Sequence, residues 1–306
     1  MAKETREASF KELLDKYDIK PTKSLGQNFL IDNFALNCII DALELKDNDT
    51  VVEIGAGLGT MSKEIAKRTE NFIAVEIDKH LMPCLNDSLR EYEKVRIINA
   101  DFLELDLESE ISSLPVSDPG TVKIAGNLPY YITTPIIMKL LEMDINIEIM
   151  VVMVQKEVVD RMIAKPGTSQ YGPLAVALQY FFQHEILFNV PPHCFYPKPK
   201  VSSTVVRFRK QKNYVNKVHN KKLFFEVVKA SFEQRRKTII NSLSNSTTLK
   251  FLSLDKEVIK SILDEVNIDS NIRGEALSLE QFVNLTNVID KYIDNIEGCP
   301  YIRKTP

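Results

Sequence analysis

Residues 127–130, Asn-Leu-Pro-Tyr, could hold an aromatic amine beside an electrophile. The Asn127 side chain offers a carbonyl oxygen, and Pro129 stiffens the turn, so that a backbone carbonyl of Leu128 or Pro129 can point into a cleft. Tyr130 adds a flat ring on which a base can stack. An amino group bonded to two such oxygens would aim its lone pair at a methyl donor. The tetrapeptide is therefore compatible with methyl transfer to an exocyclic amine, but taken alone it fits an ordinary strand end equally well, so the segments upstream of it decide.

A glycine-rich turn lies upstream, where the β-rich run Val51–Ile54 leads into Gly55-Ala56-Gly57-Leu58-Gly59-Thr60. Glycines at such a turn let the backbone approach a ligand closely before a helix begins. A dinucleotide-binding turn would need its third glycine at position 60, where this chain has Thr60. The spacing therefore disfavours NAD, whose pyrophosphate must lie on the helix N-terminus.

Two carboxylates follow the next two strand-like runs. Glu76, 21 residues after Gly55, can accept hydrogen bonds from both hydroxyls of a ribose. Asp101 can accept one from an adenine amino group, with Phe102 available to pack on the ring. Three consecutive strands that each end in a suitable group predict one nucleoside site. This order, followed by residues 127–130, resembles the S-adenosylmethionine-dependent methyltransferases that modify exocyclic amino groups.

Three more segments narrow the resemblance: Lys23–Asp32, Phe195–Val201 and Phe232–Leu243. Together they closely resemble the family that dimethylates adenine N6 in small-subunit ribosomal RNA, in register from Lys23 to Leu243. The resemblance implies S-adenosylmethionine as cofactor and two adjacent adenosines near the 3' end of the RNA as substrate, within the immature small subunit. It implies a cofactor site made of Asn28, Leu30, Gly55, Glu76, Asp101 and Asn127. For the target base, we expect the amine to bond to Asn127 and to the Leu128 or Pro129 carbonyl, and the ring to stack between Tyr130 and Phe195.

Charge is distributed unevenly along the chain. Residues 196–250 hold 14 Lys and Arg against two acids, a net charge of +12, which leaves −15 for the rest of a chain whose total is −3. Such asymmetry predicts that one region contacts a polyanion. The residues expected to contact RNA are Lys198, Lys200, Arg235, Arg236 and Lys237.

Alternation of β-rich runs with helical spacing from residue 50 onward predicts an α/β fold with a doubly wound parallel sheet. The family resemblance refines this to a Rossmann-like methyltransferase sheet of seven strands, the last antiparallel. After Lys210 the pattern becomes helical. We expect a methyltransferase domain over 1–212, with an N-terminal helical extension, and a small helical RNA-binding domain over 213–306. The expected strands are Thr50–Ile54, Phe72–Glu76, Val95–Asn99, Val122–Gly126, Ile147–Val154, Glu185–Val190 and Ser202–Phe208.

Composition bounds the remaining possibilities. Four Cys and four His are scattered without metal-ligand or disulfide spacing, so no metal is expected. The first seven residues are polar and mixed in charge, and no run of about 18 apolar residues occurs, so neither a signal peptide nor a membrane span is expected. We expect a cytoplasmic monomer.

Three alternatives stay open from the sequence. The first is a large-subunit rRNA adenine N6-methyltransferase of the macrolide-resistance type, which shares the glycine turn, residues 127–130 and the Phe195–Val201 motif. Residues 232–238 and the sizeable helical C-terminal region favour the small-subunit family over it. The second is an RNA-binding assembly or transcription factor without turnover, against which the intact Glu76, Asp101 and Asn127 argue. The third, an NAD oxidoreductase, has no catalytic His or Tyr-x-x-x-Lys pattern to support it.

Overall fold

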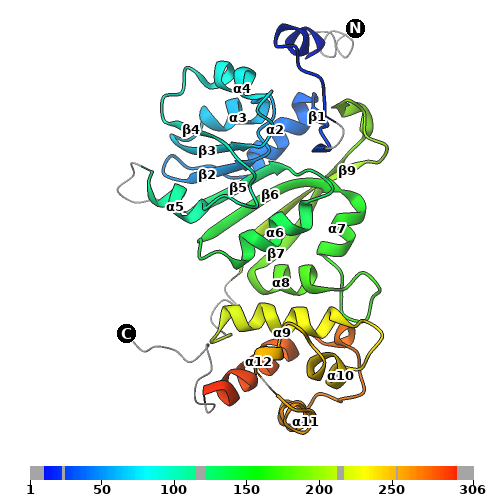
Figure 1. Cartoon of the computed structure of the whole chain (residues 1–306). Helices are drawn as coiled ribbons and strands as arrows, with labels where there is room; N and C mark the ends of the chain where they lie inside the picture. Colours follow the sequence, from blue (N-terminus) through cyan, green and yellow to red (C-terminus); the bar gives the residue numbers. More distant parts are fainter. Residues whose placement is uncertain (1–9, 23–24, 115–120, 212–216, 253, 295–306) are drawn as a thin grey trace. The chain divides into compact units, whose positions relative to one another are not determined.

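The computed structural model describes residues 10–22, 25–114, 121–211, 217–252 and 254–294. The chain forms two compact units (Figure 1). The first consists of Met1–Val159 with His184–Lys210, and the second of Asp160–Gln183 with Gln211–Pro306. Each unit is described by itself below.

The first unit is built on a seven-stranded sheet in the order β4-β3-β2-β5-β6-β9-β7. Strands β4, β3, β2, β5 and β6 run parallel to one another, and β9 pairs antiparallel with β6. The predicted doubly wound sheet with an antiparallel last strand is confirmed. The strands are β2 (Thr50–Ile54), β3 (Asn71–Glu76), β4 (Val95–Asn99), β5 (Val122–Asn127), β6 (Ile147–Gln155), β7 (Phe182–Val190) and β9 (Ser203–Lys210).

Buried strands explain why this sheet is parallel. All five residues of β2 are buried, as are most of β3, β5 and β6, which is the pattern of strands covered by helices on both faces. The helices associated with this sheet are α2 (Asn33–Ala42), α3 (Thr60–Ala66), α4 (Met82–Leu89), α5 (Leu107–Ser112), α6 (Thr133–Glu142) and α7 (Lys156–Met162), the last of which runs into the second unit. Figure 1 shows α3 and α4 beside β3 and β4.

A two-stranded ribbon joins distant parts of the first unit. Strand β1 (Phe29–Leu30) pairs antiparallel with β8 (Phe195–Tyr196), which follows the short helix η2 (Pro192–Cys194). The Ile31 amide extends the pairing by donating to the Cys194 carbonyl at 2.8 Å. Residues 10–16 form the predicted N-terminal helix, and Phe10 packs on the rings of Phe29 and Tyr196. The ribbon thus brings together two motifs that lie more than 160 residues apart; Lys23 and Ser24 of the first lie outside the described residues.

The second unit is helical. Its elements are α8 (Pro173–Phe181), α9 (Lys221–Glu233), α10 (Ile239–Ser244), η3 (Lys250–Leu252), α11 (Lys256–Glu265), η4 (Gly274–Ala276) and α12 (Leu279–Asp294). One apolar core includes Tyr180 of α8, Phe224 of α9 and Phe282 of α12. Because α8 contributes to this core, residues 160–183 group with the C-terminal helices although they precede the expected domain boundary at 212–213. Residues 212 and 213, on either side of that boundary, lie within 212–216, which are outside the described part of the chain.

Segment 165–172 contains neither helix nor strand. Among the described helices, none is both long and apolar enough to cross a membrane.

Candidate active site

A pocket lies where β2, β3 and β5 end, at the carboxyl edge of the parallel sheet. It gathers six of the predicted site residues: Asn28, Gly55, Glu76, Asn127, Leu128 and Tyr130. The carboxyl ends of parallel strands are the usual place for a ligand in this sheet type. The remaining lining residues are Leu25, Gly26, Gln27, Phe29, Gly57, Ile77, Leu81 and Pro129.

The glycine turn forms one wall of the pocket. Gly55 has a φ of +77°, in the left-handed region that favours glycine, and a Cβ there would stand 3.7 Å from the Asn127 carbonyl oxygen. Gly59 has a φ of +82°, and a Cβ there would stand 2.1 Å from Ser88 Oγ on α4. The first glycine therefore leaves room opposite Asn127, and the second lets α3 start tightly against α4.

Glu76 is fixed by main-chain amides from two sides. Its Oε2 accepts from the Gly57 N–H at 2.8 Å, and its Oε1 accepts from the Asp78 N–H at 2.8 Å. Burial raises the pKa of this carboxyl above its ordinary value, and the amide hydrogen bonds from Asp78 and Gly57 oppose that rise. Each oxygen keeps a lone pair, so the carboxylate is preorganised to accept two further hydrogen bonds from a vicinal diol.

Asn127 is oriented by the N-terminal segment. Its Nδ2 donates to the Asn28 carbonyl at 2.8 Å, and the Asn28 side chain donates to the Gly26 carbonyl at 2.9 Å. Because the amide nitrogen is bonded to Asn28, the Asn127 Oδ1 is the acceptor left for a ligand. Sequence motifs separated by 99 residues therefore meet in one hydrogen bond.

The sequence left the Leu128 and Pro129 carbonyls as alternative acceptors for the target amine, and the structure distinguishes them by their hydrogen bonds. The Pro129 carbonyl accepts from the Ile132 N–H at 3.2 Å and from Thr133 Oγ1 at 2.9 Å. Both of its lone pairs are therefore used where α6 begins. Within the described residues the Leu128 carbonyl has no hydrogen-bond partner, while its own N–H donates to the Met153 carbonyl at 3.1 Å. The free acceptor beside Asn127 is that of Leu128.

The aromatic residues divide into exposed and buried ones. The Tyr130 ring lines the pocket, and its hydroxyl is hydrogen-bonded to Ser203 Oγ at 2.9 Å. Phe195 is 0% exposed and packs in the core of the first unit. In this structure Phe195 offers no face to a base, because its position in β8 turns the ring inward. Tyr131 is 54% exposed, and its ring lies over Gly26 beside the pocket.

Two predicted cofactor residues lie outside the lining of this pocket. Leu30 lines a neighbouring hollow with Phe10, Asn33 and Thr60. Asp101 follows β4, the strand next to β3, and its Oδ1 accepts from the Leu103 N–H at 2.8 Å. Its charge contributes to raising the pKa of Tyr131, which burial raises first, so Asp101 lies close to the Tyr131 side of the pocket.

Sequence reasoning did not single out Gly57, Gln27, Ile77 or Tyr131. Gln27 links the N-terminal segment to the sheet, since its Nε2 donates to Asp78 Oδ2 at 2.7 Å. Ile77 is 41% exposed beside Glu76, where a purine could pack on it. Their positions next to Glu76, Asn28 and Tyr130 in the chain were the available signal.

A buried acid lies beneath the glycine turn. Glu53 of β2 is 1% exposed and accepts a hydrogen bond from Ser62 of α3. Burial raises the pKa of Glu53 to about 8, and the nearby Glu76 carboxylate adds to the rise. Near neutral pH Glu53 is therefore mostly protonated and joins β2 to α3 as a neutral group.

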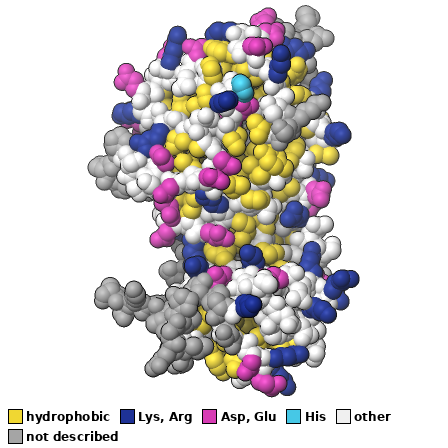
Figure 2. Space-filling model, in the orientation of Figure 1, with side chains coloured by type: hydrophobic (Ala, Val, Ile, Leu, Met, Phe, Trp, Pro, Cys, Tyr) yellow, Lys and Arg dark blue, Asp and Glu magenta, His cyan; other side chains and the backbone are white. Residues whose placement is uncertain are grey.

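The predicted RNA-contacting residues are all exposed. Lys198 and Lys200 belong to the first unit, and Arg235–Lys237 follow α9 in the second. Arg235 also has an intramolecular role: its guanidinium donates to the Ser169 carbonyl at 2.6 Å and lies 3.4 Å from a Glu275 oxygen. On the face drawn in Figure 2, Lys and Arg side chains occur on both units, interspersed with acids.

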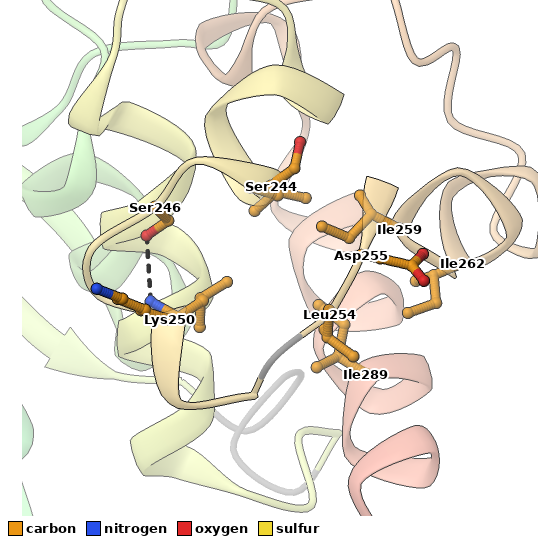
Figure 3. Close-up of a pocket in the computed structure, with 10 residues that line it drawn as sticks. Ser244, Ser246, Lys250, Leu254, Asp255, Ile259, Ile262 and Ile289 are labelled. Carbon is orange, nitrogen blue, oxygen red and sulfur yellow. Dashed lines mark hydrogen bonds between the residues drawn. The ribbon is translucent and has the colours of Figure 1, made fainter. Parts of the chain in front are cut away.

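The second unit contains a cavity of about 290 Å³ among α10, α11 and α12. Figure 3 shows Ile259, Ile262 and Ile289 at this cavity together with the polar Ser244, Ser246, Lys250 and Asp255. Ser246 Oγ accepts from the Leu249 N–H, and Asp255 caps α11. The predicted site residues do not line this cavity. In the described part of the chain, no group of three or more His, Cys, Asp or Glu side chains is arranged to hold a metal ion.

The donor set of the pocket fits S-adenosylmethionine. Glu76 keeps acceptors for ribose hydroxyls, the left-handed Gly55 leaves room for a ligand against the turn, and Asp101 follows the adjacent strand. A seven-stranded sheet with β9 inserted antiparallel and a site of this kind defines the Rossmann-like methyltransferases.

Comparison with known proteins places the chain within that class. The family model described as ribosomal RNA adenine dimethylase matches residues 19–291, and the chain belongs to that family. Two relatives, from Clostridioides difficile and Bacillus mycoides, are each 45% identical and are named ribosomal RNA small subunit methyltransferase A. The matches cover 93% of this chain and 96% of the first relative, and 91% of this chain and 94% of the second.

Solved structures agree in fold. A dimethyladenosine transferase from Plasmodium falciparum has a TM-score of 0.67 at 22% identity, over 83% of this chain and 94% of that one. The 23S rRNA methyltransferase ErmE has a TM-score of 0.59 at 25% identity, over 86% of this chain and 100% of that one. The protein is thus an rRNA adenine dimethyltransferase that uses S-adenosylmethionine, and the NAD oxidoreductase and non-enzymatic alternatives are wrong.

Proposed function

We propose that this protein dimethylates the N6 amino groups of two adjacent adenosines near the 3' end of small-subunit ribosomal RNA. The observation that carries the proposal is the 45% identity to small-subunit methyltransferases over 93% of the chain, which spans both structural units. The large-subunit alternative has weaker support, because ErmE matches at 25% identity. We further propose that the substrate is the immature small subunit and that the enzyme works as a cytoplasmic monomer.

The target amine is held by two oxygens. Asn127 Oδ1 and the Leu128 carbonyl accept its two N–H groups, because the Asn127 amide nitrogen and the Pro129 carbonyl already have partners within the chain. Accepting both hydrogens favours a pyramidal nitrogen, so the lone pair leaves conjugation with the ring. It also stabilises the positive charge that builds up on N6 as the bond forms.

S-adenosylmethionine supplies an electrophilic methyl on its sulfonium sulfur. With the cofactor held by residues such as Glu76 and Asp101, N6 would attack that methyl in line as the carbon–sulfur bond breaks, S-adenosylhomocysteine would leave, and the extra proton on N6 would pass to water. Tyr130 stacks on the flipped base, which is worth about 1–3 kcal/mol and offsets part of the cost of unstacking it. The buried Phe195 supports β8 and the Asn28 segment opposite it in this arrangement.

The sequence division assigns cofactor binding and most RNA binding to different parts of the chain in this proposal. Residues 1–212 bind the cofactor and the base, with Asn28, Leu30, Gly55, Glu76, Asp101 and Asn127 around the cofactor, and also contribute Lys198 and Lys200 to RNA binding. The helical region 213–306 binds RNA. Exposed Lys198, Lys200, Arg236 and Lys237 contact phosphates, and Arg235 adds a contact while it holds Ser169.

Parallel methylation of both subunits tests the function. The protein is incubated with methyl-labelled S-adenosylmethionine and either unmethylated small subunits or large-subunit RNA, and the modified nucleotides are mapped. We expect label on two adjacent adenosines of the small-subunit RNA as dimethyladenosine. Label confined to large-subunit RNA would establish the macrolide-resistance type instead.

A further inference from the structure

Lys139 lies in the last turn of α6 and makes an unusual set of contacts. Its Nζ donates to three backbone carbonyls of the loop after β4: Phe102 at 2.9 Å, Leu103 at 2.7 Å and Leu105 at 2.7 Å. An ammonium has three donors, so these carbonyls use all of them. The same Nζ lies 5.7 Å from the centroid of the Phe102 ring, whose residue is 4% exposed.

The loop that Lys139 holds carries the predicted adenine contact, Asp101. The Asp101 carbonyl accepts from the Glu104 and Leu105 amides, and its Oδ1 accepts from the Leu103 amide. Leu103 and Leu105 are thus each hydrogen-bonded both to Asp101 and to Lys139. Hydrogen bonds to Asp101 and to the Lys139 ammonium thus fix the conformation of this loop.

The ammonium does not neutralise the carboxylate directly. Asp101, Glu104 and Asp106 all lie near Lys139, yet its three donors go to carbonyls. Asp101 Oδ2 has no hydrogen-bond partner among the described residues and is left to accept from a ligand. Lys139 therefore fixes the loop through its backbone carbonyls and leaves the Asp101 carboxylate available to accept a hydrogen bond from a ligand.

Helix α6 also connects this loop to the target turn. At its start the Ile132 N–H and Thr133 Oγ1 donate to the Pro129 carbonyl, and six residues later Lys139 reaches the Asp101 loop. Six residues of helix span about 9 Å. One helix therefore braces both the turn that receives the target base and the loop that receives the cofactor's adenine.

We propose that Lys139 is a positioning residue for the adenine half of the cofactor, acting by holding Asp101 in place to accept the adenine amino group. The proposal rests on the proposed contact between Asp101 and adenine. Lys139 acts through the loop and not by its own contact with a ligand, because its three donors are used by backbone carbonyls. It decides whether the site distinguishes adenine from a purine that lacks the amino group.

The test compares two product analogues that differ at that amino group. Calorimetry measures the affinities of the full-length protein for S-adenosylhomocysteine and for S-inosylhomocysteine, in which a carbonyl replaces the amine. We expect the wild-type protein to prefer the first by about tenfold or more, as for one hydrogen bond to a charged group. In Lys139→Met we expect the first affinity to fall by about tenfold while the second changes by less than about twofold.

The matched control is Lys94→Met, which removes a surface lysine that is paired with Glu70 just before β4. This variant should keep the wild-type preference for S-adenosylhomocysteine. If Lys139→Met does not fold, Lys139→Gln is judged by the same ratio of affinities, since its amide retains two donors. Hydrogen exchange of the Leu103–Leu105 amides in the cofactor-free protein should be faster in either variant.

Two results would overturn the proposal, and they are distinguishable. If the Lys139 variant loses affinity for both analogues in parallel, Lys139 has only a structural role. If the wild-type protein binds both analogues equally, the Asp101 contact is misassigned and this proposal falls with it. Neither result bears on methylation of the small subunit, which is measured separately.

Discussion

At the scale of single residues, the site depends on which polar atoms are already bonded within the protein. Asn127 has its nitrogen bonded to Asn28, and Pro129 has its carbonyl bonded twice by the start of α6. What remains are two acceptors, Asn127 Oδ1 and the Leu128 carbonyl, which match the two hydrogens of one amino group. The chemistry is therefore positioning and charge stabilisation without a dedicated general base.

Replacing Asn127 tests this arrangement. Asn127→Ala should lower the single-turnover methylation rate at saturating cofactor by about 10²–10³-fold, the effect of removing one group that stabilises developing charge. Affinity for small subunits should change little, because the amide contacts the reacting amine and not phosphates. Rapid-quench assays measure the rate, and filter binding measures the affinity. Asn86→Ala, which removes an exposed amide bonded to Met82 on α4, is the control. A near wild-type rate for Asn127→Ala would exclude the proposed role.

Glu53 gives a pH-dependent prediction. Its pKa of about 8 lies above the ordinary 4.5, so between these values the folded protein keeps a proton that the unfolded chain releases. The unfolding free energy must therefore fall as pH rises through that window. Glu53→Gln keeps an acceptor for Ser62 and does not titrate, so its advantage over wild type should grow with pH to about 2–4 kcal/mol near pH 8. Urea unfolding of both proteins at several pH values measures this, and parallel curves would contradict it.

At the scale of elements, local patterns predicted most of what is built locally. The runs Thr50–Ile54 and Val95–Asn99 are strands with the expected bounds. Contacts between segments far apart in the chain could not be predicted from the sequence. The β1–β8 pairing, which buries Phe195, depends on residues far apart in sequence. Likewise, the sequence does not show that Thr133 of α6 donates to the Pro129 carbonyl. It also does not show that Lys139 donates to carbonyls of the loop that follows Asp101.

Another contact between residues far apart in the sequence lies where β2 and β5 begin. Lys123 of β5 and Asp49 before β2 form an ion pair at 2.7 Å, with side chains 1% and 3% exposed. Lys123→Met should lower the unfolding free energy by about 3–5 kcal/mol, because Asp49 is left as a buried, unpaired charge. Lys94→Met, which breaks an exposed pair with Glu70, should cost less than about 1 kcal/mol. Urea titration compares the two variants, and equal losses would show that burial of the Lys123 pair has no special cost.

At the scale of the whole molecule, the chain separates its charges by task. The acidic part of the sequence contains the cofactor site, whose Glu76 and Asp101 need to be acceptors, whereas residues 196–250 carry the excess of cations. An overall acidic protein can therefore still bind a polyanion, because association depends on local potential more than on the total charge.

The basic triplet after α9, Arg235–Lys237, tests this separation of charges. The three side chains differ in their contacts within the protein. Arg236 and Lys237 are exposed, while Arg235 holds the Ser169 and Tyr171 carbonyls and lies near Glu275. Replacing Arg236 and Lys237 together with Ala should weaken binding to small subunits. The slope of log affinity against log salt should become shallower by about 0.7–0.9 for each phosphate that the protein no longer neutralises. Melting temperature and cofactor affinity should stay at the wild-type values.

Arg235→Ala should instead lower the melting temperature, because segment 165–172 loses its hydrogen bonds to the residue that follows α9. The control for the double variant replaces Lys256 and Lys260 of α11, which are also exposed in the second unit and change the net charge by the same amount. Equal changes of slope in the two double variants would mean that the RNA responds to net charge alone. A shallower slope only for Arg236 and Lys237 means that these side chains lie on phosphates, because counterions are released only where a cation replaces them.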